Sequence, residues 1–186
     1  MIKKIFSAVM FLALFLFAQN VYAMPQIDYQ VHIEGRGWMA PVPEGAVAGT
    51  TGQGKRIEAI IINCTDGNIE YNAQLEGTGW QGWRYSGTVA GTTGEGRRLE
   101  GIRIRLTGNA AYDYDVCYRA HVEGSGWQGW VKNGQLAGTE GRGLRMEALQ
   151  IKIVRRGDSY NRGDYERDRY GRDRYRRDRY DDYYGY

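Results

Sequence analysis

The sequence predicts an all-β protein built from three copies of one short repeat around a pseudo-threefold axis. Three observations predict it: a segment that recurs three times, a strand-like alternation of residues inside each copy, and glycine clusters between the alternating stretches. Three such copies suit a β-prism-like architecture, with one sheet per copy, which we favour over a β-trefoil. A linear stack of three units is the remaining alternative.

The three copies align without gaps when Tyr29, Tyr71 and Tyr118 are superimposed, and they span approximately residues 29–64, 71–106 and 118–153. Identical residues recur along the whole aligned stretch, so the chain arose by triplication. The shared positions include Glu34/Glu76/Glu123, Trp38/Trp80/Trp127, Ala48/Ala90/Ala137, Thr50/Thr92/Thr139, Arg56/Arg98/Arg145, Glu58/Glu100/Glu147 and Ile62/Ile104/Ile151.

Each copy contains stretches in which apolar and polar residues alternate with period two. Tyr71, Ala73 and Leu75 alternate with polar residues, and Ile102 and Ile104 alternate with arginines. This period indicates strands with one buried face. Six glycines recur in every copy and separate these stretches, which predicts turns, because turns often need the positive φ that glycine adopts freely. No helical periodicity is evident in residues 24–154.

The N-terminus has the pattern of a cleaved signal peptide over residues 1–23. Lys3 and Lys4 precede an apolar run from Ile5 to Phe17, and Val21-Tyr22-Ala23 fits a cleavage site. The apolar run is too short for a membrane span. We therefore expect a secreted, extracellular protein, released or retained at the cell surface, with no membrane contact after cleavage.

The C-terminal tail, residues 155–186, consists mainly of Tyr, Arg, Asp and Gly, and tyrosines recur every five residues from Tyr160 to Tyr180. It has almost no aliphatic residues, so we expect disorder. Tyrosine and arginine together favour adhesion to the cell envelope or self-association, and a solubilising spacer is the alternative.

The two cysteines of the chain are Cys64 and Cys117. We expect a disulfide between them, because export leads to an oxidising compartment. One observation argues against it: strand parity places Cys117 on the opposite face from Tyr118.

The second copy carries the elements Glu76-Gly77-Thr78-Gly79-Trp80-Gln81-Gly82-Trp83, Ala90-Gly91-Thr92 and Arg98-Leu99-Glu100-Gly101-Ile102. In this order they resemble the clostridial hydrophobic-W (ChW) repeat, and the resemblance covers all three copies. It implies an exported bacterial protein that attaches to carbohydrate or protein outside the cell. The first copy departs from the pattern, with Met39-Ala40-Pro41 in place of Gln-Gly-Trp.

The tryptophans are the candidate ligand-binding residues. Trp38, Trp80 and Trp127 occur in every copy, which favours large core side chains. Trp83 and Trp130 are missing from the first copy, so they are better candidates for an exposed platform that stacks on sugar rings, with half-buried sheet residues as the alternative.

Glu58, Glu100 and Glu147 share parity with inward-facing isoleucines. A buried carboxylate needs a partner, and the arginine two residues earlier is one candidate. His32 and His121 occupy the same outward position in copies one and three.

The sequence predicts a non-catalytic binding protein with no cofactor and no metal. No catalytic motif, metal-ligand spacing or phosphate-binding loop is present, and residues 24–154 are nearly neutral, which argues against nucleic-acid binding. The expected partner is extracellular polysaccharide or cell-wall glycan. The alternative is a structural protein that mediates protein–protein contacts at the cell surface.

Overall fold

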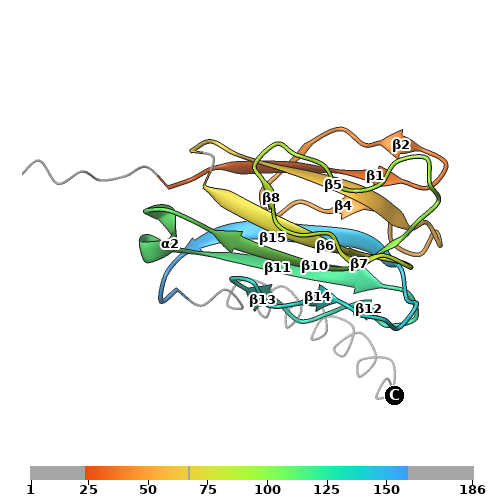
Figure 1. Cartoon of the computed structure of the whole chain (residues 1–186). Coiled ribbons are helices and arrows are strands. Elements are labelled where there is room, and N and C mark those ends of the chain that lie inside the picture. Colours follow the sequence, from red (N-terminus) through yellow and green to blue (C-terminus); the bar gives the residue numbers. More distant parts are fainter. Residues whose placement is uncertain (1–23, 67, 159–186) are drawn as a thin grey trace, which may run out of the picture.

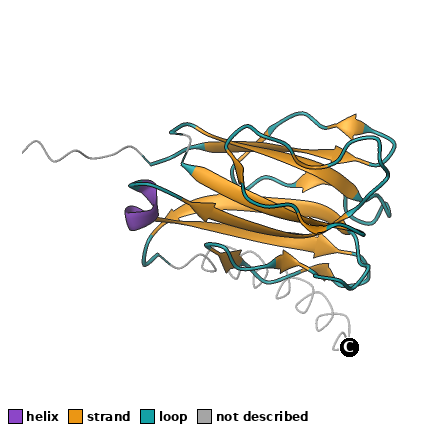
Figure 2. Ribbon diagram, viewed as in Figure 1, coloured by secondary structure: helices purple, strands orange, loops and turns teal. Residues whose placement is uncertain are grey.

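The computed structural model describes residues 24–66 and 68–158, and strands dominate this part of the chain (Figures 1 and 2). The expected signal peptide and residues 159–186 of the expected tail lie outside the described residues. Each copy supplies two long strands and three strands of two residues. The prediction of an all-β protein is confirmed, with one sheet for each copy.

The strands of copy 1 are β1 (Ile27–Ile33), β2 (Gly37–Trp38), β3 (Val42–Pro43), β4 (Ala48–Gly49) and β5 (Ile57–Cys64). Copy 2 contains β6 (Ile69–Leu75), β7 (Gly79–Trp80), β8 (Arg84–Tyr85), β9 (Ala90–Gly91) and β10 (Leu99–Leu106). Copy 3 contains β11 (Tyr114–Val122), β12 (Gly126–Trp127), β13 (Val131–Lys132), β14 (Ala137–Gly138) and β15 (Met146–Arg155).

The two long strands of each copy pair with each other in antiparallel fashion: β1 with β5, β6 with β10, and β11 with β15. The first two short strands of a copy return along its first long strand, as β2 and β3 do along β1. We call the resulting sheets the first, second and third sheet, after the copy that provides their long strands. Figure 1 shows the long strands lying roughly along one common axis, although the two long strands of each sheet run in opposite directions.

The last short strand of each copy leaves its own sheet and completes another. We call these strands, β4, β9 and β14, the closing strands. β9 pairs with β5 and β14 pairs with β10, so copies 2 and 3 each complete the sheet before them. β4 pairs with β15, which joins copy 1 to copy 3. This last pairing closes the three sheets into a ring, so the alternative of a linear stack is wrong.

The closing strands explain the repeated Ala-Gly-Thr sequence. Ala90 is fully buried, and a Cβ atom placed on Gly91 would lie 2.3 Å from the carbonyl oxygen of Glu58 and 2.6 Å from the Cα of Ala59. The Thr92 N–H donates a hydrogen bond to that same carbonyl oxygen at 3.0 Å. Each residue of the Ala-Gly-Thr motif therefore takes part in the contact between copies.

The glutamates that receive the closing strands sit at β-bulges, and we call Glu58, Glu100 and Glu147 the bulge glutamates. In the first sheet Ile33 pairs with Ile57 and His32 pairs with Ala59, so Glu58 is the extra residue without a partner. The second and third sheets skip Glu100 and Glu147 in the same way. A bulge interrupts alternation, so the sequence parity of these residues no longer predicts their direction.

Three fully buried tyrosines bond neighbouring copies together. The Tyr71 hydroxyl donates to the Thr88 carbonyl of its own copy and accepts from the Ile62 N–H of copy 1 at 3.2 Å. The Gly87 N–H then donates to the Ile62 carbonyl at 2.8 Å. Tyr29 and Tyr118 make the equivalent bonds to Ile151 and Ile104. These contacts continue the sheet edge beyond the short closing strand.

The core lies between the three sheets and consists mainly of the inward-facing residues of the long strands. It joins all three copies in one cluster, in which Ile60, Ile102 and Leu149 are at most 1% exposed. Burial of such side chains contributes roughly 1.5–3 kcal/mol each. One copy alone could not form this core, because its sheet has a single apolar face.

One short helix, α2 (Ala110–Asp113), lies between copies 2 and 3, and the residue pattern did not predict it. Tyr71 and Tyr118 are 47 positions apart, whereas Tyr29 and Tyr71 are 42 apart, and α2 occupies this longer link. The helix, the start of β1 and the end of β15 lie at the same end of the molecule (Figure 1).

Substitution of Gly91 by alanine is expected to lower the free energy of unfolding by about 3 kcal/mol or more, because the new Cβ would overlap backbone atoms of Glu58 and Ala59. Gly94→Ala is the matched control: Gly94 also has a positive φ, +77°, but open space around it, so we expect a loss of only about 1–2 kcal/mol. Urea denaturation measures both, and equal losses would contradict the role assigned to the closing strand.

The stability of the protein is expected to fall as the pH rises from about 9 to about 12. Burial raises the pKa of Tyr29 and Tyr118 from 10.0 to about 12, and burial also raises the pKa of Tyr71. In this pH range the folded chain holds more protons than the unfolded chain, so increasing pH favours unfolding. Denaturation midpoints across this range measure the decline. Tyr118→Phe should make the fall in stability with pH less steep. An unchanged slope would contradict the assignment of this fall to the buried tyrosines.

Candidate functional site

The outer faces of the three sheets carry the tryptophans. In β1 the buried residues alternate with half-exposed ones, and His32 is on the outer, half-exposed side. Trp38 pairs directly with His32, and cross-strand partners share one face, so Trp38 is also on the outer side. Trp80 and Trp127 pair in the same way with Gln74 and His121.

The interpretation of Trp38, Trp80 and Trp127 as core side chains is therefore wrong. Trp38 is 37% exposed, and the other two are partly exposed. Tyrosine and aliphatic residues fill the core instead. The Gly-Trp strand follows a three-residue turn, and its Trp pairs with an outward-facing position of the long strand, which a periodicity argument does not reveal.

Trp83 and Trp130 precede β8 and β13 and are also partly exposed. The outer faces of the second and third sheets thus have two tryptophans each, whereas the first sheet has Trp38 alone and Pro41 at the second position. The five candidate residues are not brought together in one site; they are divided over three faces.

Positively charged side chains lie over the indole rings of the second and third sheets. On the second sheet, the Arg103 guanidinium carbon is 4.4 Å from the Trp80 ring centre, and that of Arg105 is 4.0 Å from the Trp83 ring centre. These are cation–π distances, and an arginine so placed restricts the orientation of the ring.

On the third sheet a single arginine contacts both tryptophans. The Arg119 guanidinium carbon lies 4.9 Å from the Trp127 ring centre and 4.8 Å from that of Trp130. The Lys152 ammonium lies 4.2 Å from the Trp130 ring centre. The His121 ring meets Trp127 edge to face, with the ring centres 5.4 Å apart. The two indoles are thereby held by three neighbouring side chains of one face.

Carboxylates distinguish the second sheet from the third. Arg105 forms an ion pair with Glu70 at 2.6 Å, and Glu140 is 3.6 Å from Arg103 and accepts a hydrogen bond from Trp80 Nε1 at 2.9 Å. Arg119 instead donates from Nε to the neutral Gln150 side chain at 2.8 Å. Within residues 24–66 and 68–158, no carboxylate lies within ion-pair distance of Arg119.

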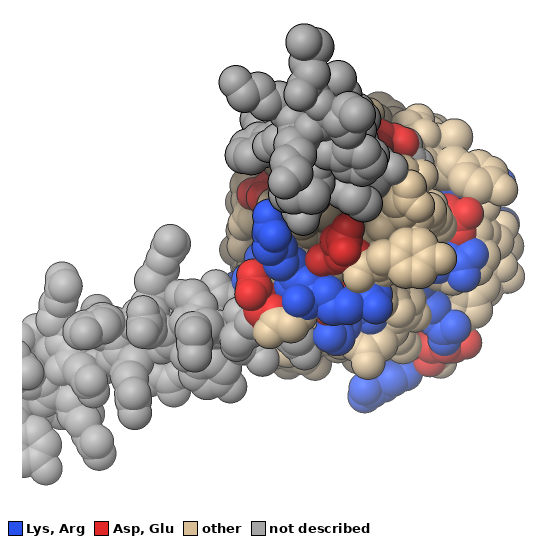
Figure 3. Space-filling view, turned by 90° about the vertical axis from the view of Figure 1, so that its left-hand side faces the viewer, with Lys and Arg blue, Asp and Glu red and all other residues tan. Residues whose placement is uncertain are grey.

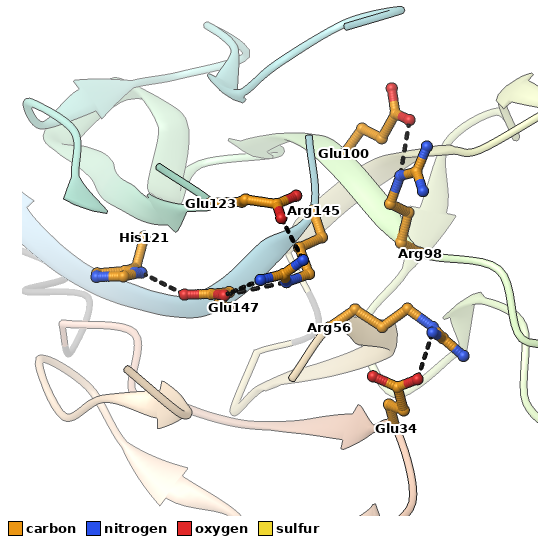
Figure 4. A network of polar contacts seen from close by, with 8 residues as sticks. All are labelled: Glu34, Arg56, Arg98, Glu100, His121, Glu123, Arg145 and Glu147. Atoms are coloured by element: carbon orange, nitrogen blue, oxygen red, sulfur yellow. Dashed lines mark hydrogen bonds and ion pairs between the residues drawn. The ribbon is translucent and has the colours of Figure 1, made fainter. Parts of the chain in front are cut away.

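The bulge glutamates belong to a polar network near the turns between the long strands, and Figure 4 draws Glu100 and Glu147 with their partners. Glu58 is 5% exposed, and Arg56 donates from Nε to Glu58 at 3.0 Å and also pairs with Glu34. The arginine partner predicted for each bulge glutamate is confirmed in all three copies.

The predicted inward direction of the bulge glutamates is wrong, because the bulge changes the parity. The Glu58 carboxylate is 3.1 Å from Nδ1 of His32, and Glu147 is equally close to His121, on the outer side of the sheets. Each carboxylate is paired with an arginine and holds the bulge, which is a structural role.

The end of the molecule that carries α2 has a gathering of Lys and Arg beside acidic side chains (Figure 3). Asp115, which is 3% exposed, bonds to Lys132 at 2.9 Å and lies 3.6 Å from Arg156. Burial opposes ionisation of Asp115, but hydrogen bonds from Lys132 and Asn133 and the two positive charges outweigh it, so its pKa is lowered. Part of the positive charge is thus neutralised internally.

A cavity of about 350 Å³ lies at this same end, between Met24, Asp66 and Tyr114. It contains none of the tryptophans. The cavity is therefore distinct from the tryptophan faces, which we take as the candidate site.

The expected disulfide is wrong, because both cysteines are free. Cys64 ends β5 in the first sheet, whereas Cys117 lies within β11 of the third sheet. Burial is the main cause that raises the pKa of Cys64 to about 12 and that of Cys117 to about 11, so neither thiol is activated as a nucleophile.

Neither residues 24–66 nor 68–158 contain a group of three or more His, Cys, Asp or Glu side chains placed to hold a metal ion. The same residues contain no helix that is both long and apolar enough to span a membrane.

These features define a class of protein, an all-β triplet in which the copies complete one another's sheets. The sequence profile of the family described as Clostridial hydrophobic W matches residues 32–66, 74–108 and 121–155, once in each copy. The chain therefore belongs to the Clostridial hydrophobic W (ChW) family, and the predicted resemblance is confirmed. No curated protein and no solved structure matches the chain significantly.

Two thiols per chain are expected to react with a thiol reagent when the non-reduced protein is denatured. In the folded protein at neutral pH the reaction should be slow, because Cys117 is fully buried and both pKa values are raised. Thiol titration before and after denaturation measures this, with Cys64→Ser to assign the faster site. Fewer than two thiols in the denatured chain would contradict the free cysteines.

Proposed function

We propose that this protein is a non-catalytic binding protein that recognises polysaccharide or cell-wall glycan outside the cell. The observation that carries the proposal is the pair of partly exposed tryptophans on the outer faces of the second and third sheets, each held by a cation. Aromatic rings with fixed orientation are suited to stacking against sugar rings, because little side-chain freedom is lost on binding.

The extracellular location is part of the proposal and rests on the sequence of residues 1–23, with its basic start and short apolar run. The protein would be released or retained at the cell surface once this segment is removed.

We further propose that the architecture is a β-prism rather than a β-trefoil. Each sheet consists of the long hairpin of one copy and one exchanged strand, which supports an arrangement of one sheet per copy. Such an arrangement gives three separate outer faces, and each can carry its own binding residues.

The alternative function is a structural protein that mediates protein–protein contacts at the cell surface, and the described sheet edges do not favour one form of it, assembly by strand addition. The long strands are flanked by two-residue strands, and the buried tyrosine hydroxyl and the Gly87 N–H cover the Ile62 edge of β5. Short, covered edges are poor templates for pairing with another chain. The expected contribution of the tail to self-association falls outside the described residues.

Trp83→Ala and Trp130→Ala are each expected to weaken glycan binding roughly tenfold or more, because a buried indole contact contributes over about 1 kcal/mol. The fold should survive, since both side chains are on the outer surface. Retention of the protein lacking its signal peptide on insoluble polysaccharides and cell walls, together with tryptophan fluorescence, measures binding.

Trp38→Ala is the matched control, because its sheet lacks a second tryptophan and should contribute little. Equal retention of wild-type, W83A and W130A proteins would contradict the proposal, as would a wild-type protein that binds none of the polymers. In the latter case protein partners would become the better explanation.

A further inference from the structure

The three outer faces occupy equivalent positions in the fold but differ in charge. At the position of Arg119 the first sheet has Gln30 and the second has Asn72. The first sheet has Ile61 and Asn63 where the second has Arg103 and Arg105. The faces can therefore be compared as natural variants of one surface.

Arg119 on the third sheet is held in place without being neutralised by a carboxylate of the described residues. Its guanidinium lies between two indoles, and its Nε donates to Gln150 at 2.8 Å. An arginine side chain keeps its charge at every physiological pH, and its two terminal nitrogens form a planar fork suited to carboxylate or phosphate oxygens. The stacking fixes the fork before any ligand arrives.

The second sheet shows the contrasting case. Its arginines also stack on indoles, but Glu70 pairs with Arg105, and Glu140 lies near Arg103 and bonds to Trp80. These carboxylates occupy the positions at which an anionic ligand group would bind and would repel it.

The third sheet has another donor at the same place. Nε1 of Trp130 is buried and has no hydrogen-bond acceptor among the described residues. A buried donor without a partner is costly, so an oxygen atom brought by a ligand would be stabilised here. Lys152, over the Trp130 ring, adds positive charge beside it.

We infer that the third sheet is the selective face and that it binds an anionic glycan, a sugar polymer bearing carboxylate or phosphate groups. A sugar ring stacks beside Trp127 and Trp130, and the anionic group accepts hydrogen bonds from the terminal nitrogens of Arg119. This inference rests on the proposed glycan-binding function and adds the charge of the ligand and the face that recognises it.

The test uses polymers that differ only in charge and the protein lacking only its signal peptide. Polygalacturonate is compared with its fully methyl-esterified form, and phosphomannan with dephosphorylated mannan, so the two pairs distinguish a carboxylate from a phosphate ligand. We expect at least one anionic polymer to bind about tenfold or more tightly than its neutral form. Poly-glutamate, which is anionic without sugar rings, should bind weakly.

Arg119→Gln should remove this preference, so that the charged and the neutral polymer bind equally well to the variant. Arg105→Gln on the second sheet is the matched control and should keep the preference, because Glu70 already neutralises Arg105. Thermal melting checks that both variants fold. If Arg119→Gln does not fold, the comparison of charged and neutral polymers on the wild-type protein still tests whether the ligand is anionic.

The outcomes separate this inference from the proposed function. Equal binding of charged and neutral polymers, an unchanged preference in Arg119→Gln, or equally tight binding of poly-glutamate would overturn the inference and leave glycan binding in place. Failure of the wild-type protein to bind any glycan would overturn both.

Discussion

The exchange of one short strand between copies is the constraint on which the rest of this structure depends. A closing strand of two residues offers few backbone hydrogen bonds, so the contact is reinforced by the close approach of glycine, by a bond to the carbonyl of the bulge glutamate and by the buried tyrosine. The ring requires all three exchanges at once. Because the core lies between the sheets, its burial and the closure of the ring occur together.

This constraint separates residues that hold the ring from residues that can vary. The identical positions of the copies include Tyr71, Ala90, Gly91, Glu100 and their equivalents, and these make the contacts between copies or shape the bulge. Several other outer-face positions differ among the copies, and one of them holds Gln30, Asn72 or Arg119. A triplicated scaffold can thus keep one method of closure while each face acquires different chemistry.

The sequence was sufficient for the elements that depend on local pattern. Alternation in residues 71–75 and 102–106 predicted the long strands, and the repeats predicted one sheet per copy. Three features depended on contacts distant in sequence and were missed or misread: the outer position of Trp38, the direction of Glu58 and the separation of Cys64 from Cys117. The position of Trp38 depends on its cross-strand pairing, and the direction of Glu58 depends on a bulge. The separation of the cysteines depends on how the three sheets are arranged in the ring.

Cyclic exchange has a consequence for how such a chain can evolve. If one copy were lost, the remaining sheets would include one without its closing strand and a closing strand without its sheet, because β4 of the first copy reaches only the last. An added copy would need a wider ring with different angles between sheets. Gain or loss of copies would therefore be tolerated only in sets of three, because three copies are the number that closes this ring.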